Sequence, residues 1–201
     1  MASFEAIGAV GKSLERLLSA GFADPPAPAS GAKAVLVRSD DLKDGAGFFA
    51  PPALTIFLHR VAPNTVMRSA WSGVGSVDGV AHTPLDLHYL FTPWGTDAES
   101  EHRILGRAIQ IMETTPILSG PLLYPSATWA PNETVQVVLE EIGTESIMRV
   151  FDKLTTDYRP SVSYVARVAR LDGRVQAPVS DVTTAIRGMR PSVTPPSGGA
   201  P

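Results

Sequence analysis

Histidines and nearby carboxylates are the residues of this chain whose chemistry could support catalysis. His82, Asp86, His88 and His102 follow one another closely, and imidazole and carboxylate groups are common ligands of zinc and iron. Their spacing matches no metal-binding motif such as His-Glu-x-x-His, because Pro84 separates the first two and His102 falls in a different predicted element. We therefore expect no metal and no other cofactor, and keep a small metal-dependent hydrolase as an alternative function.

Asp86 and His88 are two residues apart in a segment that is typical of a β-strand, so their side chains share one face. Side chains in this arrangement can form a hydrogen-bonded pair. We expect such a pair to fix the start of the helix that is predicted to begin at Asp97.

The glycine-rich segment 73–79 is the other place where chemistry could be sought. It contains Ser76, but not in the Gly-x-Ser-x-Gly order that presents a serine nucleophile between a strand and a helix. It also lacks the Gly-Lys-Ser/Thr sequence of a phosphate-binding loop. The chain has no cysteine, which excludes thiolate metal sites, disulfides and a cysteine nucleophile. We expect segment 73–79 to be a surface loop and the protein not to be an enzyme.

The composition is that of a soluble globular protein. The chain has 201 residues, of which 44% are hydrophobic and 18% charged, enough apolar material for one core. A formal net charge of -3, with scattered basic residues, predicts no nucleic-acid partner. The sequence shows neither a signal peptide nor an apolar run long enough to span a bilayer, so we expect assembly in the cytoplasm, no direct membrane contact and release by a route such as lysis.

The most informative segment is 83–92, which alternates in size and polarity as a strand does. Leu85, Leu87, Tyr89 and Phe91 are predicted to share one face, opposite Asp86, His88, Leu90 and Thr92. The acidic turn that follows, with Asp97 or Ser100 as an N-cap, predicts a helix that ends before Pro116.

The remaining segments complete an α+β pattern. A helix over 3–20, capped by Ser3 and stopped by Gly21, is predicted from three- and four-residue apolar spacing. Further strands are expected at 34–37, 54–61, 66–71, 135–139 and 161–171, with 66–71 as the hairpin partner of 54–61 and a helix at 144–155. We predict one α+β domain over 1–171, with a mainly antiparallel sheet and helices packed on one face, followed by a Pro/Gly-rich extension over 172–201.

Three groups of residues are candidates for an interface with other chains. Phe48 and Phe49 lie in a loop and must either pack or be exposed. Arginines on and just before the last strand could form a basic stripe, or be ordinary solvated charges at the rim of a sheet. The C-terminal extension could supply an added strand to a neighbouring subunit. The candidate residues are Phe48, Phe49, Arg159, Arg167, Arg170, Val179, Val182 and Ile186.

Several segments together resemble one protein family. Leu85-Asp-Leu-His-Tyr-Leu90, the acidic turn and His102-Arg-Ile-Leu-Gly106 are similar to the cap, or tube-terminator, family of extracellular contractile injection systems, which are phage-tail-like particles. Segments 7–18, 54–64 and 158–164 continue the resemblance in the order of the family, from about residue 4 to about residue 171.

The resemblance implies a structural role. Proteins of this family look like small α+β tail-terminator modules arranged in a ring, so the resemblance implies a homohexamer that ends the inner tube and sheath at the end distal to the baseplate. Longer relatives carry an additional C-terminal domain, whereas here we expect only the Pro/Gly-rich extension after the last strand, which leaves the partners of such a domain open. A second alternative is an adaptor that binds cargo or a membrane anchor through Phe48 and Phe49.

Overall fold

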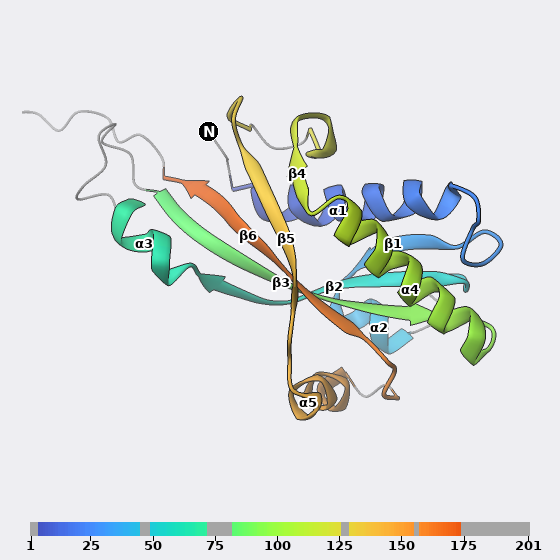
Figure 1. The fold of residues 1–201 in the computed structure, drawn as a ribbon. Coiled ribbons are helices and arrows are strands. Elements are labelled where there is room, and N and C mark those ends of the chain that lie inside the picture. Colours follow the sequence, from blue (N-terminus) through green and yellow to red (C-terminus); the bar gives the residue numbers. More distant parts are fainter. Residues whose placement is uncertain (1–3, 45–48, 72–81, 126–128, 155–156, 174–201) are drawn as a thin grey trace, which may run out of the picture.

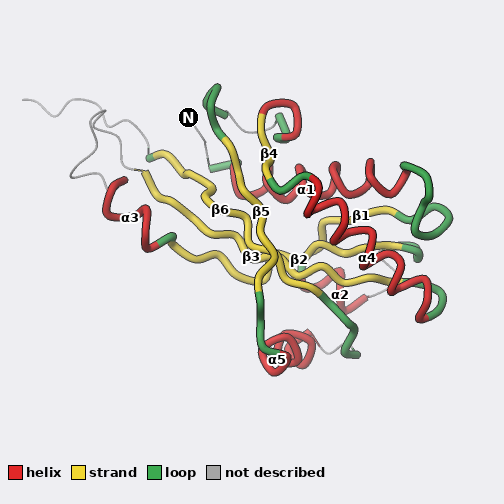
Figure 2. The backbone as a smooth tube through the Cα atoms, viewed as in Figure 1, coloured by secondary structure: helices red, strands yellow, loops and turns green. Residues whose placement is uncertain are grey.

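The structure, a computed structural model, describes residues 4–44, 49–71, 82–125, 129–154 and 157–173. It contains a curled sheet with helices on it (Figures 1 and 2). The strands are β1 (Lys33–Val37), β2 (Ala53–Pro63), β3 (His82–Trp94), β4 (Ile117–Ser119), β5 (Thr134–Glu140) and β6 (Val162–Asp172). The helices are α1 (Ala6–Ala23), α2 (Ser39–Asp44), α3 (Thr65–Trp71), α4 (Ala98–Thr114) and α5 (Thr144–Leu154).

The sheet is mainly antiparallel, as predicted. Its strand order is β1-β2-β3-β6-β5-β4, and only the β1–β2 pair is parallel, with α2 in the connection between them. The longest strands lie in the middle, where β3 pairs with β2 on one side and with β6 on the other. The central strands therefore form a long, twisted platform that carries side chains on two different faces.

The main core lies between one face of this platform and the two long helices α1 and α4. Leu87, Tyr89 and Phe91 of β3 are buried there, which confirms the predicted face of this strand. The helices contribute Val10, Leu14 and Leu18 from α1 and Ile104, Ala108, Ile111 and Met112 from α4. Each helix buries an apolar stripe of three- and four-residue spacing, so most of its stability comes from the sheet beneath it.

A second, smaller core lies on the opposite face, where the prediction placed no helix. Phe49, Ala53, Trp94 and Leu154 are buried in it together with Val37 and Leu42. The expectation of helices on one face therefore holds for α1 and α4, whereas α2 and α5 cover part of the other face. The reason is that β1 and β2 are apolar on both faces, as strands buried on both sides are.

Residues 66–71 form the helix α3 and not the predicted hairpin strand. The side chain of Asn64 accepts a hydrogen bond from the backbone N–H of Met67 at 2.9 Å and so caps the first turn. The carboxylate of Asp86 in turn accepts hydrogen bonds from Asn64 Nδ2 at 3.0 and 3.1 Å. The expectation that Asp86 pairs with His88 and fixes the helix after Asp97 was wrong, because Asp86 instead holds the cap of α3.

The helix α4 begins as predicted. Asp97 accepts a hydrogen bond from the backbone N–H of Ser100 at 2.9 Å, and the Ser100 hydroxyl lies 3.3 Å from the backbone nitrogen of Asp97. This reciprocal capping box supplies hydrogen-bond acceptors to two backbone N–H groups at the N-terminal end of the helix. Residues 117–119, which lie in none of the predicted strands, form the short strand β4.

The helix α1 continues past Gly21, which was predicted to stop it. A Cβ at this position would lie 2.5 Å from Cδ1 and 2.8 Å from Cγ1 of Ile111. Arg107 also donates a hydrogen bond from Nε to the Gly21 carbonyl at 3.2 Å. Gly21 therefore allows α1 to pack closely against α4. At the other end of α1, the predicted N-cap Ser3 lies outside the described residues.

Two β-bulges change the alternation that the sequence pattern predicts. In β2 the register against β3 shifts between Leu58 and Arg60, so that His59 is the extra residue. In β6 a second shift lies opposite the Leu85–Leu87 segment of β3, and Ala166 and Ala169 both join the main core. Strict alternation would have put these two alanines on opposite faces.

Candidate functional site

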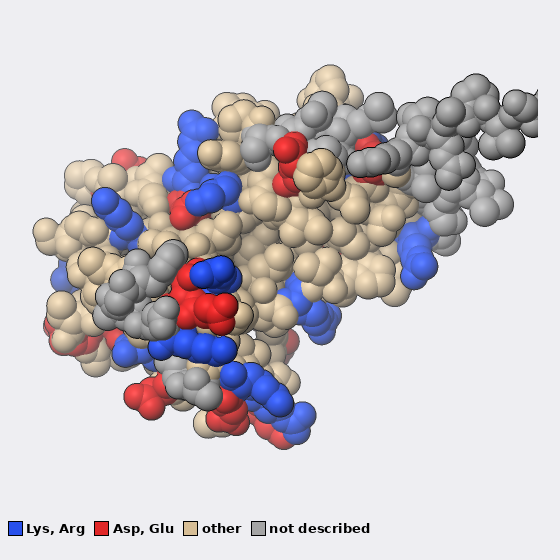
Figure 3. Space-filling view, turned by 180° about the vertical axis from the view of Figure 1, so that it is seen from behind, with Lys and Arg blue, Asp and Glu red and all other residues tan. Residues whose placement is uncertain are grey.

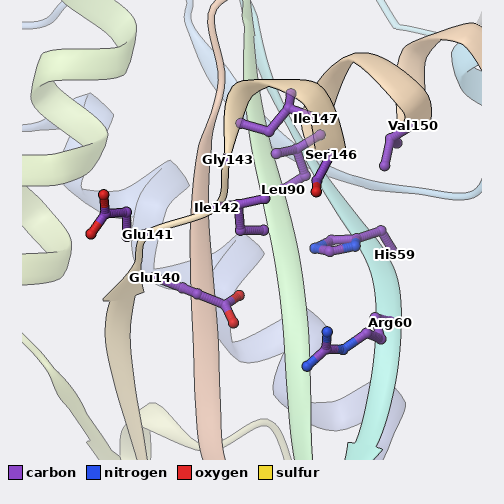
Figure 4. Close-up of a pocket in the computed structure, with 10 residues that line it drawn as sticks. All are labelled: His59, Arg60, Leu90, Glu140, Glu141, Ile142, Gly143, Ser146, Ile147 and Val150. Atoms are coloured by element: carbon purple, nitrogen blue, oxygen red, sulfur yellow. The ribbon is translucent and has the colours of Figure 1, made fainter.

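A polar network crosses the sheet on the face opposite the main core. Arg60 of β2 donates from Nη2 to Nε2 of His88 on β3 at 3.1 Å. The Nδ1 atom of His88 lies 2.8 Å from a carboxylate oxygen of Glu140 on β5. Figure 4 shows Arg60 and Glu140 reaching towards each other from either side of β3. The network therefore joins β2 and β3 to β5, which is adjacent to neither of them in the sheet.

The chemistry of arginine fixes the proton positions in this network. A guanidinium group only donates hydrogen bonds, so Nε2 of His88 must be the acceptor. Its Nδ1 atom then carries the proton and donates it to Glu140, which places a neutral imidazole between a cation and an anion. His88 itself is 4% exposed. A buried polar side chain with both ring nitrogens bonded is a stabilising element of the fold.

Glu140 is held as a carboxylate by its neighbours. Burial raises its pKa, but the hydrogen bonds from His88 and Ser163 and the charge of Arg60 lower the pKa further, so that it lies below its ordinary value. The Ser163 hydroxyl donates to the same oxygen of Glu140 at 3.1 Å. The sequence pattern singled out His88 but neither Arg60 nor Glu140. Arg60 and Glu140 each lie in a predicted strand segment that is mostly apolar. Only the order of the strands in the sheet shows that both residues meet His88.

The four residues considered as metal ligands are not brought together. His82 lies 2.5 Å from Asp172 across the β3–β6 pair, and Asp86 holds Asn64. His102 is on the exposed side of α4. Within the part of the chain that the structure describes, no three histidine, aspartate or glutamate side chains are close enough to hold a metal ion. The geometry therefore gives the metal-dependent hydrolase no support.

The three arginines expected to form a basic stripe lie in different surroundings. Arg159 lies over the ring of Trp94, with its Cζ atom 4.3 Å from the ring centroid, and pairs with Glu101 of α4. Arg170 donates to Asp172 at 3.3 Å. Arg167 is exposed on β6. Two of the three arginines thus have partners within the chain, and Arg167 is the one best placed to meet another molecule.

The aromatic loop residue Phe49 is not an exposed anchor. It is 5% exposed and packs edge to face against Trp94, with ring centroids 4.8 Å apart. The adaptor alternative relied on an exposed Phe48-Phe49 pair, and the packing of Phe49 removes half of that surface. Phe48 and the extension residues Val179, Val182 and Ile186 lie outside the described residues.

One edge of the sheet is closed by side chains of α1. The backbone N–H of Ala34 donates to the Ser19 hydroxyl at 3.1 Å, and that of Leu36 donates to the Glu15 carboxylate at 3.0 Å. These are the β1 groups that face away from β2, since the same N–H cannot serve both sides. A further strand could not pair there without displacing α1.

The other edge of the sheet is only partly covered. The short β4 pairs with β5 as far as Gln136, and Val137 N–H donates to the Pro116 carbonyl at 2.7 Å. Leu139 is two residues further on, so its N–H and C=O point to the same outer side. This part of β5 pairs with β6 on its inner side, but in the described chain no strand pairs with its outer side, and Leu139 is 50% exposed. A hollow of about 450 Å³, lined by residues of β5, β6 and α5, lies beside it.

Charges on the surface are mixed in sign. On the face seen in Figure 3, acidic and basic side chains are interleaved. This arrangement differs from the continuous basic surface of a nucleic-acid-binding protein. None of the helices that the structure describes is both long and apolar enough to cross a membrane.

Comparisons with known proteins agree on one family and one fold. Residues 9–185 match the family model described as the Pvc16 N-terminal domain. The chain is similar in structure to a sheath/tube terminator of an extracellular contractile injection system, PVC, in its extended state, with a TM-score of 0.55 and 14% identity. It is equally similar to the tube-terminating cap of the anti-feeding prophage, again with a TM-score of 0.55 and 14% identity.

The similarity covers most of this chain but less of the two solved structures. It spans 93% of this chain and 65% of the PVC terminator, and 88% of this chain and 60% of the anti-feeding prophage cap. No curated protein matches the chain. At this level of identity the two structures establish the shared fold, and the family match identifies the kind of module.

Proposed function

The chain belongs to the Pvc16 N-terminal domain family, and from this premise we propose that it is a structural cap of a contractile injection particle. It would end the inner tube and sheath at the end distal to the baseplate. The family match over residues 9–185 is the observation that carries the proposal. The shared fold with a sheath/tube terminator and a tube-terminating cap supports it.

The unequal edges of the sheet suit a protein that stops growth. A terminator must join the last layer of the assembly and present no further edge to which another strand could be added. The β1 edge is closed by Ser19 and Glu15 of α1, whereas the β5 edge at Leu139 is open. We propose that the open edge accepts a strand from a neighbouring subunit, because main-chain pairing needs no particular sequence.

Six copies in a ring are the proposed assembly, with the tube and sheath subunits as partners. Cyclic symmetry uses one pair of complementary surfaces repeatedly and leaves no unmatched subunit. The proposed division is a domain over 1–171 and an extension over 172–201. In the extension, Val179, Val182 and Ile186 would contact the sheath. In the domain, Arg167 would contact a neighbouring chain. We further propose assembly in the cytoplasm, followed by release through lysis.

The role is proposed to be structural and not enzymatic. Three titratable groups on the polar face form a hydrogen-bonded network that stabilises the sheet, in which Arg60 and Glu140 both bond to His88. A general base or nucleophile would need a free lone pair directed at a substrate. In this network both nitrogens of His88 are already in use.

Imaging of assembled particles tests the cap. We expect cryo-electron microscopy of particles from cells that express the chain to show density of this fold at the end distal to the baseplate, and particles from cells that lack it to have tubes of irregular length. At micromolar concentration, mass photometry of the purified chain should show a multimer. A strict monomer that never joins purified particles, or a different polypeptide at that end, would contradict the proposal.

A further inference from the structure

A hollow lies under the first half of α5, beside the polar network. It has a volume of about 390 Å³ and lies between the bulge in β2 and the start of α5 (Figure 4). Because the bulge adds one residue to β2, His59 and Arg60 both line this hollow. We call it the His59 pocket and define it by six of the residues that line it, which are His59, Arg60, Leu90, Ser146, Ile147 and Val150.

His59 is a titratable residue whose hydrogen bonding the fold leaves incomplete. Its Nε2 atom is buried and has no hydrogen-bond partner among the described residues, although buried ring nitrogens are normally paired. The ring lies edge-on to the ring of His88, with the two centroids 6.2 Å apart. Both nitrogens of His88 are already bonded, to Arg60 and to Glu140, so this neighbouring ring has no group to offer to His59.

The groups around the His59 pocket disfavour a proton on the His59 ring. Burial lowers the pKa of His59 most, His88 and Arg60 lower it further, and Glu140 raises it, so that the pKa lies below its ordinary value. The Glu140 carboxylate is already the acceptor for His88. Glu141 also lines the hollow, but Figure 4 shows it apart from the His59 ring. The side chains that α5 contributes to the hollow carry no charge.

The first half of α5 is held less firmly than the second. The buried residues of this helix are Phe151 and Leu154, and both lie in its second half. Ile147, which faces the hollow from the first half, is only partly buried. A charged imidazole ring in the hollow would have to be hydrated, because a buried charge without a partner is costly. Water can enter if the first half of α5 separates from the sheet while the second half stays attached.

We infer that His59 is a proton-operated switch. Its neutral ring lets the first half of α5 lie against the sheet, and its protonation in mildly acidic solution releases this half of the helix. The hollow beside Leu139 shares Ile142 and Ile147 with the His59 pocket. Release of α5 would therefore also change the surface beside the open edge of β5. The switch belongs to the isolated chain and is independent of the proposed cap role.

Urea unfolding between pH 7.5 and pH 5.5 tests the switch. This range lies above the ordinary pKa of glutamate, 4.5, so that histidines dominate the titration. Because the folded-state pKa of His59 is below its ordinary value, the unfolded chain takes up the proton first as pH falls, and the folded state loses stability. We expect the ratio of the folding constants of the original chain and His59→Gln to fall by about threefold or more, where one proton allows at most about tenfold per pH unit.

His102 provides the matched control, since it is exposed on α4. His102→Gln should keep the pH dependence of the original chain, whereas His59→Gln should lose the part that this ring contributes. If His59→Gln does not fold, nuclear magnetic resonance on the original chain takes its place, because the ring signals of 4 histidines can be followed one by one. The His59 ring should titrate below its ordinary value, and the methyl signals of Ile147 should move with the same midpoint.

Hydrogen exchange of backbone amides tests which element moves. After correction for the intrinsic effect of pH on exchange, the amides of α5 should exchange about threefold faster or more at pH 5.5 than at pH 7.5, because a released segment opens more often. The amides of α1, which packs on the other face of the sheet, should change less. The acceleration in α5 should be absent in His59→Gln and present in His102→Gln.

Three results would overturn the switch. The first is an equal pH dependence of stability in the original chain and in His59→Gln. The second is a His59 ring that titrates at or above its ordinary value, since the fold would then favour the proton. The third is a stability that follows His59 while the exchange of the α5 amides does not, which would exclude α5 as the element that is released. The cap role is tested on particles, so the failure of either proposal leaves the other standing.

Discussion

His88 is buried in the middle of β3 and lies between a cation and an anion. Arg60 donates to one ring nitrogen and Glu140 accepts from the other. The position of His88 is thus explained by hydrogen bonds to β2 and β5, and not by the expected pair with Asp86. Removal of the Glu140 carboxylate should lower the stability of the fold most, since this group joins the network to β5.

Replacement of this carboxylate tests the network at the residue scale. We expect Glu140→Gln to lower the free energy of unfolding at pH 7 by about 1–2 kcal/mol, the range for a hydrogen bond to a charged group that is partly exposed. The folded-state pKa of Glu140 is below its ordinary value, so its contribution is present above the ordinary pKa and is lost as pH falls through the folded pKa. Urea unfolding at pH 7 and pH 3 measures both effects.

The neighbouring Glu141, which is exposed, provides the control. Glu141→Gln should change the free energy of unfolding little at either pH. If the difference between the original chain and Glu140→Gln were as large at pH 3 as at pH 7, the carboxylate charge would not be its source.

At the scale of elements, α1 has two tasks. Its apolar stripe of Val10, Leu14 and Leu18 packs on the sheet, and its Glu15 and Ser19 take up the outer N–H groups of β1. An unprotected edge strand is a ready template for pairing with another chain. The helix therefore supplies core packing and blocks one edge of the sheet.

Removal of the two acceptors should open the β1 edge. In the double variant Glu15→Ala and Ser19→Ala, two partly buried N–H groups lose their partners, and we expect the free energy of unfolding to fall by about 1–3 kcal/mol. The freed edge should also cause concentration-dependent association, which sedimentation velocity measures. The control variant Arg16→Ala changes an exposed residue of the same helix but keeps both acceptors, and it should sediment as the original chain does. Association in both variants alike would show that edge protection is not the cause.

At the scale of the whole molecule, the β1 edge of the sheet is closed and the opposite edge, at Leu139 of β5, is open. Leu139 marks the open end, where the outer groups of β5 have no strand beside them in the described chain. A particle cap needs this kind of asymmetry, because it must bind on one side and stop growth on the other. The proposed extension over 172–201 would add a second attachment to the sheath.

Truncation separates the domain from the extension. Deletion of residues 174–201 keeps Asp172, which lies 2.5 Å from His82, so we expect the unfolding temperature of the domain to be preserved. Attachment to the sheath should weaken, as measured by the fraction of purified particles that retain the chain. A full-length variant with Val179, Val182 and Ile186 replaced by serine should show the same defect if these side chains make the contact. Unchanged incorporation of the truncated chain would dismiss the extension as an arm.

Much of the architecture could be predicted from local patterns. The alternation at Leu87, Tyr89 and Phe91 predicted their common face, and Asp97 with Ser100 predicted the start of α4. These predictions succeeded because the period of a strand and the cap of a helix depend on residues close together in the chain. The prediction for 66–71 failed because the cap of α3 depends on Asp86, which is distant in the sequence.

The sequence by itself determined that the chain builds an α+β domain, which segments form its long strands and helices, and which face of β3 is apolar. Only the tertiary structure decided that Arg60, His88 and Glu140 meet, that His59 lies at a bulge, and that α1 closes one sheet edge while Leu139 lies on an open one. The physical reason is that the order and register of strands are set by packing over the whole domain, so that a side chain's partners follow from contacts between distant segments.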